Sequence, residues 1–158
     1  GQQLSRRDEW LGMHQYFSHL LLCLECLRTH GNRLISLVYN QAIGGAFIAY
    51  GLMADTILAL PDAKVAVMWL EAMARVTKLD LSRLQELSKT SPVFAPGVTN
   101  FQALGGISEV VDLAQLSNVL LRVAAETGQT DLRAENGYRR GGRQLAYPVI
   151  QQVLVSKP

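Results

Sequence analysis

The central part of the chain, residues 33–68, alternates between short strand-like apolar runs and one helical run. Leu34–Tyr39, Thr56–Leu60 and Lys64–Met68 are short runs of mostly apolar residues, typical of strands buried in a sheet. Between the first two, Phe47–Met53 carries Ala, Leu and Met at helical spacing and predicts a short buried helix. This alternation of strands and helices predicts an α/β fold.

A glycine-containing turn joins the first predicted strand to this helix. Asn40 and Gln41 are expected to turn the chain into Gly44-Gly45-Ala46, where the helix begins. Glycine lets a ligand approach the backbone, and the first amides of a helix have no partner within it. The turn is therefore a candidate anion site. A structural role is the alternative, because close packing of a helix on a strand also requires small residues.

Outside this centre, apolar residues three or four apart predict four amphipathic helices. These are Glu9–His30, which ends at Gly31, Trp69–Leu79, Leu81–Ser88 and Leu113–Thr127. Val93–Asn100 is expected to be a structured turn around Pro96-Gly97, and Gln129–Arg143 a polar, glycine-rich segment. The last segment, Gln144–Val155, is interrupted at Pro148 and is expected to pack against a partner.

Composition limits the classes of protein that the chain can belong to. A length of 158 residues suits a single domain with its own core. The hydrophobic content of 49% with 18% charged residues fits either buried layers on both faces of a sheet or a large subunit interface. Asp55, Asp62 and Lys64 interrupt the longest apolar stretch, which falls short of the roughly 20 residues of a membrane span. No membrane partner is therefore expected, and we also predict a cytoplasmic location and no nucleic-acid partner.

Charge is unevenly distributed along the chain. The net charge is +2, yet five basic residues face only two acidic ones from Asp131 onward. A basic tail suits an acidic partner such as a carrier protein or a phosphorylated cofactor, and a solvated tail is the alternative.

The cysteines and histidines do not have the spacing of a metal site. Cys23 and Cys26 form a single C-x-x-C within a helical pattern, whereas zinc needs two further ligands. We interpret the pair as packed, reduced thiols in the core. His14, His19 and His30 are interpreted as surface or capping residues of the same helix. No metal is expected.

Several motifs together resemble a known family. They are Ser5–Glu9, Gly44–Phe47, Gly51, Ala54–Asp55, Ala59–Pro61, Val67–Met68, Ala72–Val76, Ser91–Val98 and Arg140–Arg143. In this order they resemble the carboxyltransferase branch of the crotonase superfamily, and more closely the gamma subunit of malonate decarboxylase. The resemblance implies a crotonase-like spiral of ββα units with C-terminal helices. It also implies that residues 1–158 are one domain, incomplete at the N-terminus and forming the C-terminal portion of a longer subunit, with about one and a half units present.

The resemblance also implies an activity, the decarboxylation of malonyl-S-acyl carrier protein to acetyl-S-acyl carrier protein together with a beta subunit. Backbone amides at Gly44, Gly45 and Ala46 would form an oxyanion or carboxylate pocket that stabilises the enolate. A second pocket would lie on the beta subunit, and which pocket holds the thioester and which the carboxylate stays open. Gly1 and Gln2 match a loop that faces the active site, so they are candidate substrate-binding residues.

The implied partners are the beta subunit and an acyl carrier protein, which Arg139, Arg140 and Arg143 are expected to contact. No cofactor is expected on this chain, since the phosphoribosyl-dephospho-CoA group of the carrier subunit is presented as substrate. Two alternatives stay open. One is a carboxyltransferase subunit of a biotin-dependent acyl-CoA carboxylase. The other is a non-catalytic scaffold subunit, with which the scarcity of acid–base candidates is compatible.

Overall fold

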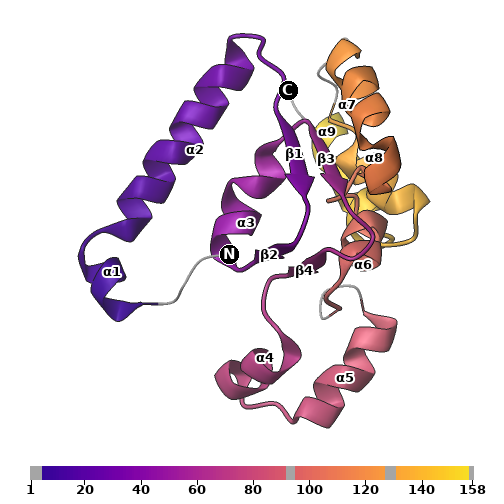
Figure 1. The fold of residues 1–158 in the computed structure, drawn as a ribbon. Coiled ribbons are helices and arrows are strands. Elements are labelled where there is room, and N and C mark those ends of the chain that lie inside the picture. Colours follow the sequence, from indigo (N-terminus) through magenta and orange to yellow (C-terminus); the bar gives the residue numbers. More distant parts are fainter. Residues whose placement is uncertain (1–4, 92–94, 127–130, 157–158) are drawn as a thin grey trace.

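The computed structural model describes residues 5–91, 95–126 and 131–156, and its centre consists of two consecutive ββα units (Figure 1). The first contains β1 (Ile35–Val38), β2 (Gln41–Ile43) and α3 (Gly45–Ala49). The second contains β3 (Thr56–Ala59), β4 (Lys64–Ala66) and α4 (Leu70–Thr77). Short 3-10 turns, η1 (Gly51–Met53) and η2 (Leu113–Gln115), lie before β3 and after β5 (Glu109–Val110).

The two units pair strand by strand. β1, β3 and β5 form a parallel sheet in that order, with Ile35 opposite Thr56, and β2 and β4 form a second parallel pair, with Gln41 opposite Lys64. Each strand of the second unit lies beside its counterpart in the first, as the ββα spiral requires. The predicted α/β class is confirmed. The expectation of one and a half units was wrong, because residues expected to turn the chain form β2, held by its pairing with β4.

The core lies around β3. Ile57, Leu58 and Ala59 are at most 1% exposed, as expected for a strand covered on both faces. The ring of Phe47 from α3 packs against that of Phe101 from α6 (Val98–Ala103), with ring centroids 6.0 Å apart. This contact joins the first ββα unit to the C-terminal part of the chain.

The N-terminal helical region is two helices rather than the predicted one. α1 (Arg6–Trp10) and α2 (Met13–Thr29) are separated at Gly12, whose φ of +84° is left-handed. α2 lies at the left of Figure 1, packs against α3, and contains no buried residue. Cys23 and Cys26 are exposed, free cysteines, so their assignment to the core was wrong. The face of α2 that meets α3 carries Met13, Phe17, Leu21 and Leu24, which are half-buried, whereas the two cysteines are exposed.

The remaining helices are α5 (Leu81–Thr90), α7 (Leu116–Ala125), α8 (Arg133–Arg139) and α9 (Ala146–Val155). α4 and α5 form the pair of helices at the bottom of Figure 1. α6 and α8 form where irregular structure was expected. Pro148 does not interrupt α9, because it lies in the first turn, where a backbone N–H has no intrahelical acceptor. Within the described ranges, no helix is long and apolar enough to cross a membrane.

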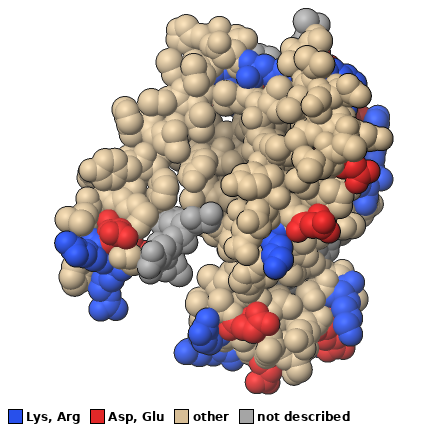
Figure 2. All heavy atoms as spheres, in the orientation of Figure 1, with Lys and Arg blue, Asp and Glu red and all other residues tan. Residues whose placement is uncertain are grey.

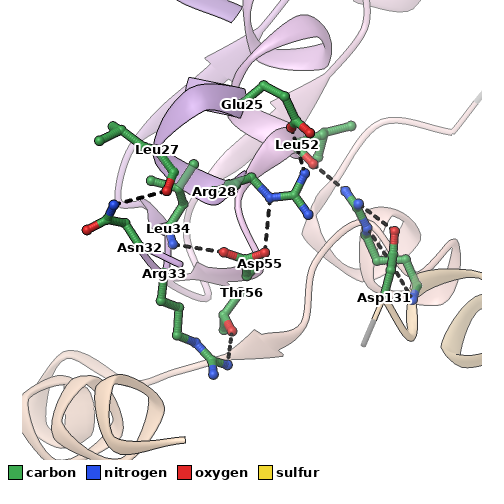
Figure 3. Close-up of polar contacts among 11 residues, drawn as sticks. Glu25, Leu27, Arg28, Asn32, Arg33, Leu34, Leu52, Asp55, Thr56 and Asp131 are labelled. Atoms are coloured by element: carbon green, nitrogen blue, oxygen red, sulfur yellow. Dashed lines mark hydrogen bonds and ion pairs between the residues drawn. The ribbon is translucent and has the colours of Figure 1, made fainter. Parts of the chain in front are cut away.

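The Asp55 side chain connects α2 to the segment that leads into β1 through two hydrogen bonds (Figure 3). Its Oδ2 accepts the Leu34 N–H at 2.9 Å, and its Oδ1 accepts the Arg28 Nε–H at 3.1 Å. The Asp55 side chain is only 10% exposed, and Arg28 also pairs with Glu25 at 3.0 Å. A nearly buried carboxylate thus receives one backbone and one charged donor, the arrangement that a buried charge requires.

Candidate functional site

The glycine turn lies between the end of β2 and the start of α3. Gly44 has φ +87° and ψ −175°, a conformation essentially restricted to glycine. Its N–H donates to the Ala66 carbonyl at 3.1 Å, and its carbonyl accepts the Ile48 N–H at 3.3 Å. Both backbone groups of Gly44 are therefore used to fix the turn, and its amide is not available to a ligand.

The next two amides are differently placed. Gly45 and Ala46 are the first residues of α3, and none of the hydrogen bonds between described residues uses their N–H groups. Gly45 is exposed, whereas Ala46 is only 2% exposed. Gly45 is therefore the amide that a ligand reaches first. Because α3 has only five residues, its dipole is small, and the donors themselves supply any anion binding.

A second glycine turn is held on the other side of β4. The Gly97 N–H donates to the Val65 carbonyl at 2.6 Å, next to the Ala66 carbonyl that holds Gly44. Consecutive carbonyls of a strand point to opposite sides. β4 therefore fixes the starts of both α3 and α6. The sequence indicated a turn at Gly97, but no local signal showed that it binds the same strand as the Gly44 turn.

A cavity of about 310 Å³ runs along the first ββα unit. Its lining is residues 36–42, which run from β1 through the connecting residues into β2, together with Phe47, Tyr50 and Gly51. Gly44, Gly45 and Ala46 are not among its lining residues. The first ββα unit therefore carries, near the turn, a cavity large enough for a small molecule.

Comparison with known proteins identifies the family. A family model described as the malonate decarboxylase gamma subunit (MdcE) matches residues 1–157. The chain belongs to the malonate decarboxylase gamma subunit family. The resemblance seen in the sequence motifs is thereby confirmed.

Individual relatives agree with this assignment. The malonyl-S-ACP:biotin-protein carboxyltransferase MADD of Malonomonas rubra is 34% identical over 165 residues, covering 95% of this chain and 56% of that protein. A Pseudomonas malonate decarboxylase hetero-tetramer in complex with coenzyme A contains a chain with 25% identity and a TM-score of 0.80, over 99% of this chain and 64% of that one. The Pseudomonas MdcD-MdcE hetero-dimer contains a chain with 26% identity and a TM-score of 0.73, over 98% of this chain and 62% of that one.

The transcarboxylase 12S core shares the fold alone, at 23% identity and a TM-score of 0.60. The chain spans just over half of its curated relative and just under two thirds of the Pseudomonas chains.

Of the residues predicted to bind substrate, Gly1 and Gln2 lie outside the described part of the structure.

The family motif Arg140–Arg143 packs closely against the rest of the fold. Arg140 Nη1 donates to the carbonyls of Gln102 at 3.0 Å and Ile107 at 2.9 Å, and Nη2 donates to that of Ser108 at 3.0 Å. A Cβ on Gly142 would lie 2.3 Å from the Ala103 carbonyl oxygen, so only glycine fits there. Arg140 therefore holds the C-terminal helices on the connection between α6 and β5.

The other two arginines predicted to meet a carrier have different surroundings. Arg139 is exposed and pairs with Glu135 of the same helix at 2.5 Å. Arg143 is half-buried, and its aliphatic stem lies over Gly137. The three side chains thus differ: Arg139 pairs along its own helix, Arg140 is bound to three backbone carbonyl groups, and Arg143 is half-buried.

Titratable groups with shifted pKa values lie around α7 and α8. The hydrogen bond from Arg133 lowers the pKa of Asp131, while Asp131 in turn raises the pKa of Arg133. Glu109 raises the pKa of Arg122 through a hydrogen bond. Among the described residues, no group of three or more His, Cys, Asp or Glu side chains is placed to hold a metal ion. The shifts reflect two ion pairs, one local to the start of α8 and one between α7 and β5.

Proposed function

We propose that the chain works as part of the gamma subunit of a malonate decarboxylase complex. Together with a beta subunit it decarboxylates malonyl-S-acyl carrier protein to acetyl-S-acyl carrier protein. Family membership supports this proposal, as does the malonyl-S-ACP substrate named for its Malonomonas relative. The observation that carries it is the pair of amides at Gly45 and Ala46, which have no hydrogen-bond partner among the described residues.

The chemistry at this turn needs donors rather than a strong base. When the carbon–carbon bond to the carboxylate breaks, its electron pair forms an enolate and carbon dioxide leaves. The Gly45 amide donates a hydrogen bond to an oxygen that becomes negative in this step, with Ala46 as the adjacent donor. Losing one such donor costs about 3–4 kcal/mol of transition-state stabilisation in enzymes of this kind. A facing pocket on the beta subunit completes the site, and Gly1 and Gln2 remain candidate substrate contacts.

The surface of the chain supports a heteromeric assembly. Figure 2 shows few charged side chains over α2 and the centre of the face, with charges gathered around α1, α4 and α5 and along one edge. Neither α2 nor α9 has a buried residue. Their exposed apolar side chains include Tyr16, Leu20, Leu22, Leu27, Val149, Val153, Leu154 and Val155. Extended apolar surface of this kind marks a protein interface, and the related Pseudomonas chains belong to a hetero-dimer and a hetero-tetramer.

Carrier, cofactor and compartment complete the proposal. The exposed Arg139 is the residue through which the basic tail meets an acidic carrier, since Arg140 is engaged within the fold. This chain binds no cofactor of its own, because the carrier presents the prosthetic group as part of the substrate. Two free cysteines suit a reducing compartment, which supports the cytoplasm.

A second candidate is carboxyl transfer to a biotin protein. It rests on the activity for which the Malonomonas relative is named, that of a malonyl-S-ACP:biotin-protein carboxyltransferase. Both reactions pass through the same enolate, and they differ in whether the carboxyl group is released or captured. We expect turnover by the reconstituted complex to be insensitive to avidin. Inhibition by avidin would assign the chain to the biotin-dependent reaction.

The main test is Gly45→Val in the reconstituted complex. Gly45 has helical backbone geometry that any residue adopts, so the variant is expected to fold and to assemble with the beta subunit. Turnover of malonyl-S-acyl carrier protein should fall at least about a hundredfold, the loss typical of one oxyanion donor. The turnover of Gly45→Ala should lie between that of Gly45→Val and that of the wild type, because the smaller alanine side chain leaves the Gly45 amide more accessible to the substrate.

Circular dichroism and gel filtration control for misfolding and loss of assembly. An assembled, fully active Gly45→Val complex would remove the turn from the mechanism. It would instead favour a scaffold role for this subunit.

A further inference from the structure

A second cavity, of about 530 Å³, lies where η1, α6 and α8 meet. Its size is within the range of small-molecule binding sites. Its walls are mainly apolar, with charged side chains from α8 and the segments that flank it. The lining residues are Leu52, Phe101, Leu104, Gly105, Gly106, Asp131, Arg133, Ala134 and Arg143. It shares no lining residue with the cavity beside the glycine turn.

Two of the three charged side chains in this cavity neutralise each other. Arg133 donates from Nε to Asp131 Oδ1 at 2.8 Å and from Nη2 to Oδ2 at 2.6 Å. This fork-to-fork pair is the geometry in which arginine and a carboxylate bind most strongly. Arg133 also donates from Nη1 to the Leu52 carbonyl, which fixes the guanidinium against η1. Neither Asp131 nor Arg133 is therefore available as the main contact of a charged ligand.

Arg143 is the charged side chain that remains. Its Cγ and Cδ lie 2.9 and 2.6 Å from the position that a Cβ on Gly137 would occupy, so glycine makes room for the arginine stem. The residue is half-buried, yet within the described ranges its guanidinium takes part in no hydrogen bond or ion pair. The lining as a whole therefore carries one uncompensated positive charge beside an apolar wall. A guanidinium without a partner beside an apolar wall favours an anionic ligand.

We propose that this cavity binds a small organic anion, in which a carboxylate or phosphate group is attached to an apolar chain. The anionic group binds the fork of Arg143, whose planar donors match both kinds of oxyanion. The apolar chain lies against Leu52, Phe101 and Leu104, where its burial contributes to affinity. The site stands on the contacts of Arg143 and does not depend on the proposed decarboxylation.

The proposal is tested by titrating the intact subunit, alone and assembled with its partner subunit, by isothermal calorimetry. The probes are hexanoate, hexyl phosphate, hexanol and inorganic phosphate. We expect one or both hexyl anions to bind at least tenfold more tightly than hexanol and inorganic phosphate, because both the charge and the chain are needed. Comparing the two hexyl anions shows which oxyanion the site prefers.

Matched variants locate the binding. Arg143→Met keeps an unbranched stem over Gly137 but removes the charge, and it should weaken binding of the preferred hexyl anion at least tenfold. Arg139→Met removes the same charge from open surface and should change the affinity less than twofold. Ala134→Leu fills the cavity from α8 without changing any charge, and it should also weaken binding. This variant keeps the test decisive if Arg143→Met is poorly folded.

Two results would overturn the proposal. One is equal binding of hexanol and the hexyl anions, which would show that the charge is not recognised. The other is unchanged affinity of the anion in a folded Arg143→Met or Ala134→Leu subunit, which would place its binding elsewhere on the surface.

Discussion

Replacing Arg140 by Met tests whether the family motif at Arg140–Arg143 supports the fold. Three carbonyl groups, those of Gln102, Ile107 and Ser108, lose a charged donor at 2.9–3.0 Å. Each such bond contributes about 1 kcal/mol net, and the partly buried Ile107 carbonyl would in addition be left without this donor. We therefore expect Arg140→Met to lower the free energy of unfolding by about 2–3 kcal/mol.

Arg139→Met is the matched control, because it removes the same charge from the neighbouring residue. Its exposed pair with Glu135, four residues earlier on α8, is expected to contribute only about 0.3–0.5 kcal/mol. Urea unfolding of the two variants measures the difference directly. At roughly 2–4 °C per kcal/mol for a chain of this size, melting temperatures should differ by several degrees. Equal urea midpoints for Arg139→Met and Arg140→Met would show that the three hydrogen bonds contribute nothing to stability.

Two further predictions concern carboxylates. Asp55→Ala should lower the free energy of unfolding by about 2–4 kcal/mol, because it leaves the Leu34 N–H and the Arg28 guanidinium without their shared acceptor. A loss below about 0.5 kcal/mol in urea unfolding would contradict this. Arg133 lowers the pKa of Asp131 below its usual 3.8. The stabilisation from this pair is therefore complete above that value and lost as the pH falls through the lower folded-state pKa. Melting temperatures measured between pH 7 and pH 2 should fall less steeply for Asp131→Asn than for the wild type, and identical slopes would refute the pairing.

The sequence predicted the strands that are buried on both faces. β3 leaves a nearly continuous apolar run in the sequence because all four of its residues are buried, and β4 adds the buried Val65 and Ala66 after the exposed Lys64. β2 leaves no such run, since Gln41 is exposed and the strand has only three residues. Its extended conformation depends on pairing with β4, more than 20 residues later, which no local pattern records.

The sequence did not predict two helices, α6 and α8, for a related reason. α8 contains Asn136 and Gly137, which are poor helix formers, and the polar segment around them is typical of a loop. Gly137 is nevertheless buried, and a side chain there would collide with the Leu104 carbonyl. Tertiary packing overrides local preference at this position. α6 was likewise not predicted, because Pro96-Gly97 indicated a structured turn over Val93–Asn100, whereas a helix begins at Val98.

The glycine turn was visible in the sequence because its signal is local, a strand followed by two glycines and a helix. The different roles of the Gly44 and Gly45 amides were not visible in the sequence. Gly44 uses its own amide to extend the β2–β4 pairing, and this leaves Gly45 as the accessible donor. The hydrogen bond from Gly97 to the same strand joins residues more than 30 positions apart. Such a link follows only from the assembled sheet.

The cysteines show why an apolar stripe does not by itself identify a core. Cys23 and Cys26 lie among leucines at helical spacing, and the same spacing arises whether a helix packs on its own domain or on a partner. In α2 one apolar face is half-buried, with the ring of Phe17 against that of Tyr50, while further apolar side chains stay exposed. Most apolar side chains of α9 are exposed as well. The hydrophobic content of 49% is therefore shared between a compact core around β3 and surfaces that suit association. The proposed active site is completed by a second subunit and requires such surfaces, so the exposed apolar side chains support the same proposal as the accessible amide of Gly45.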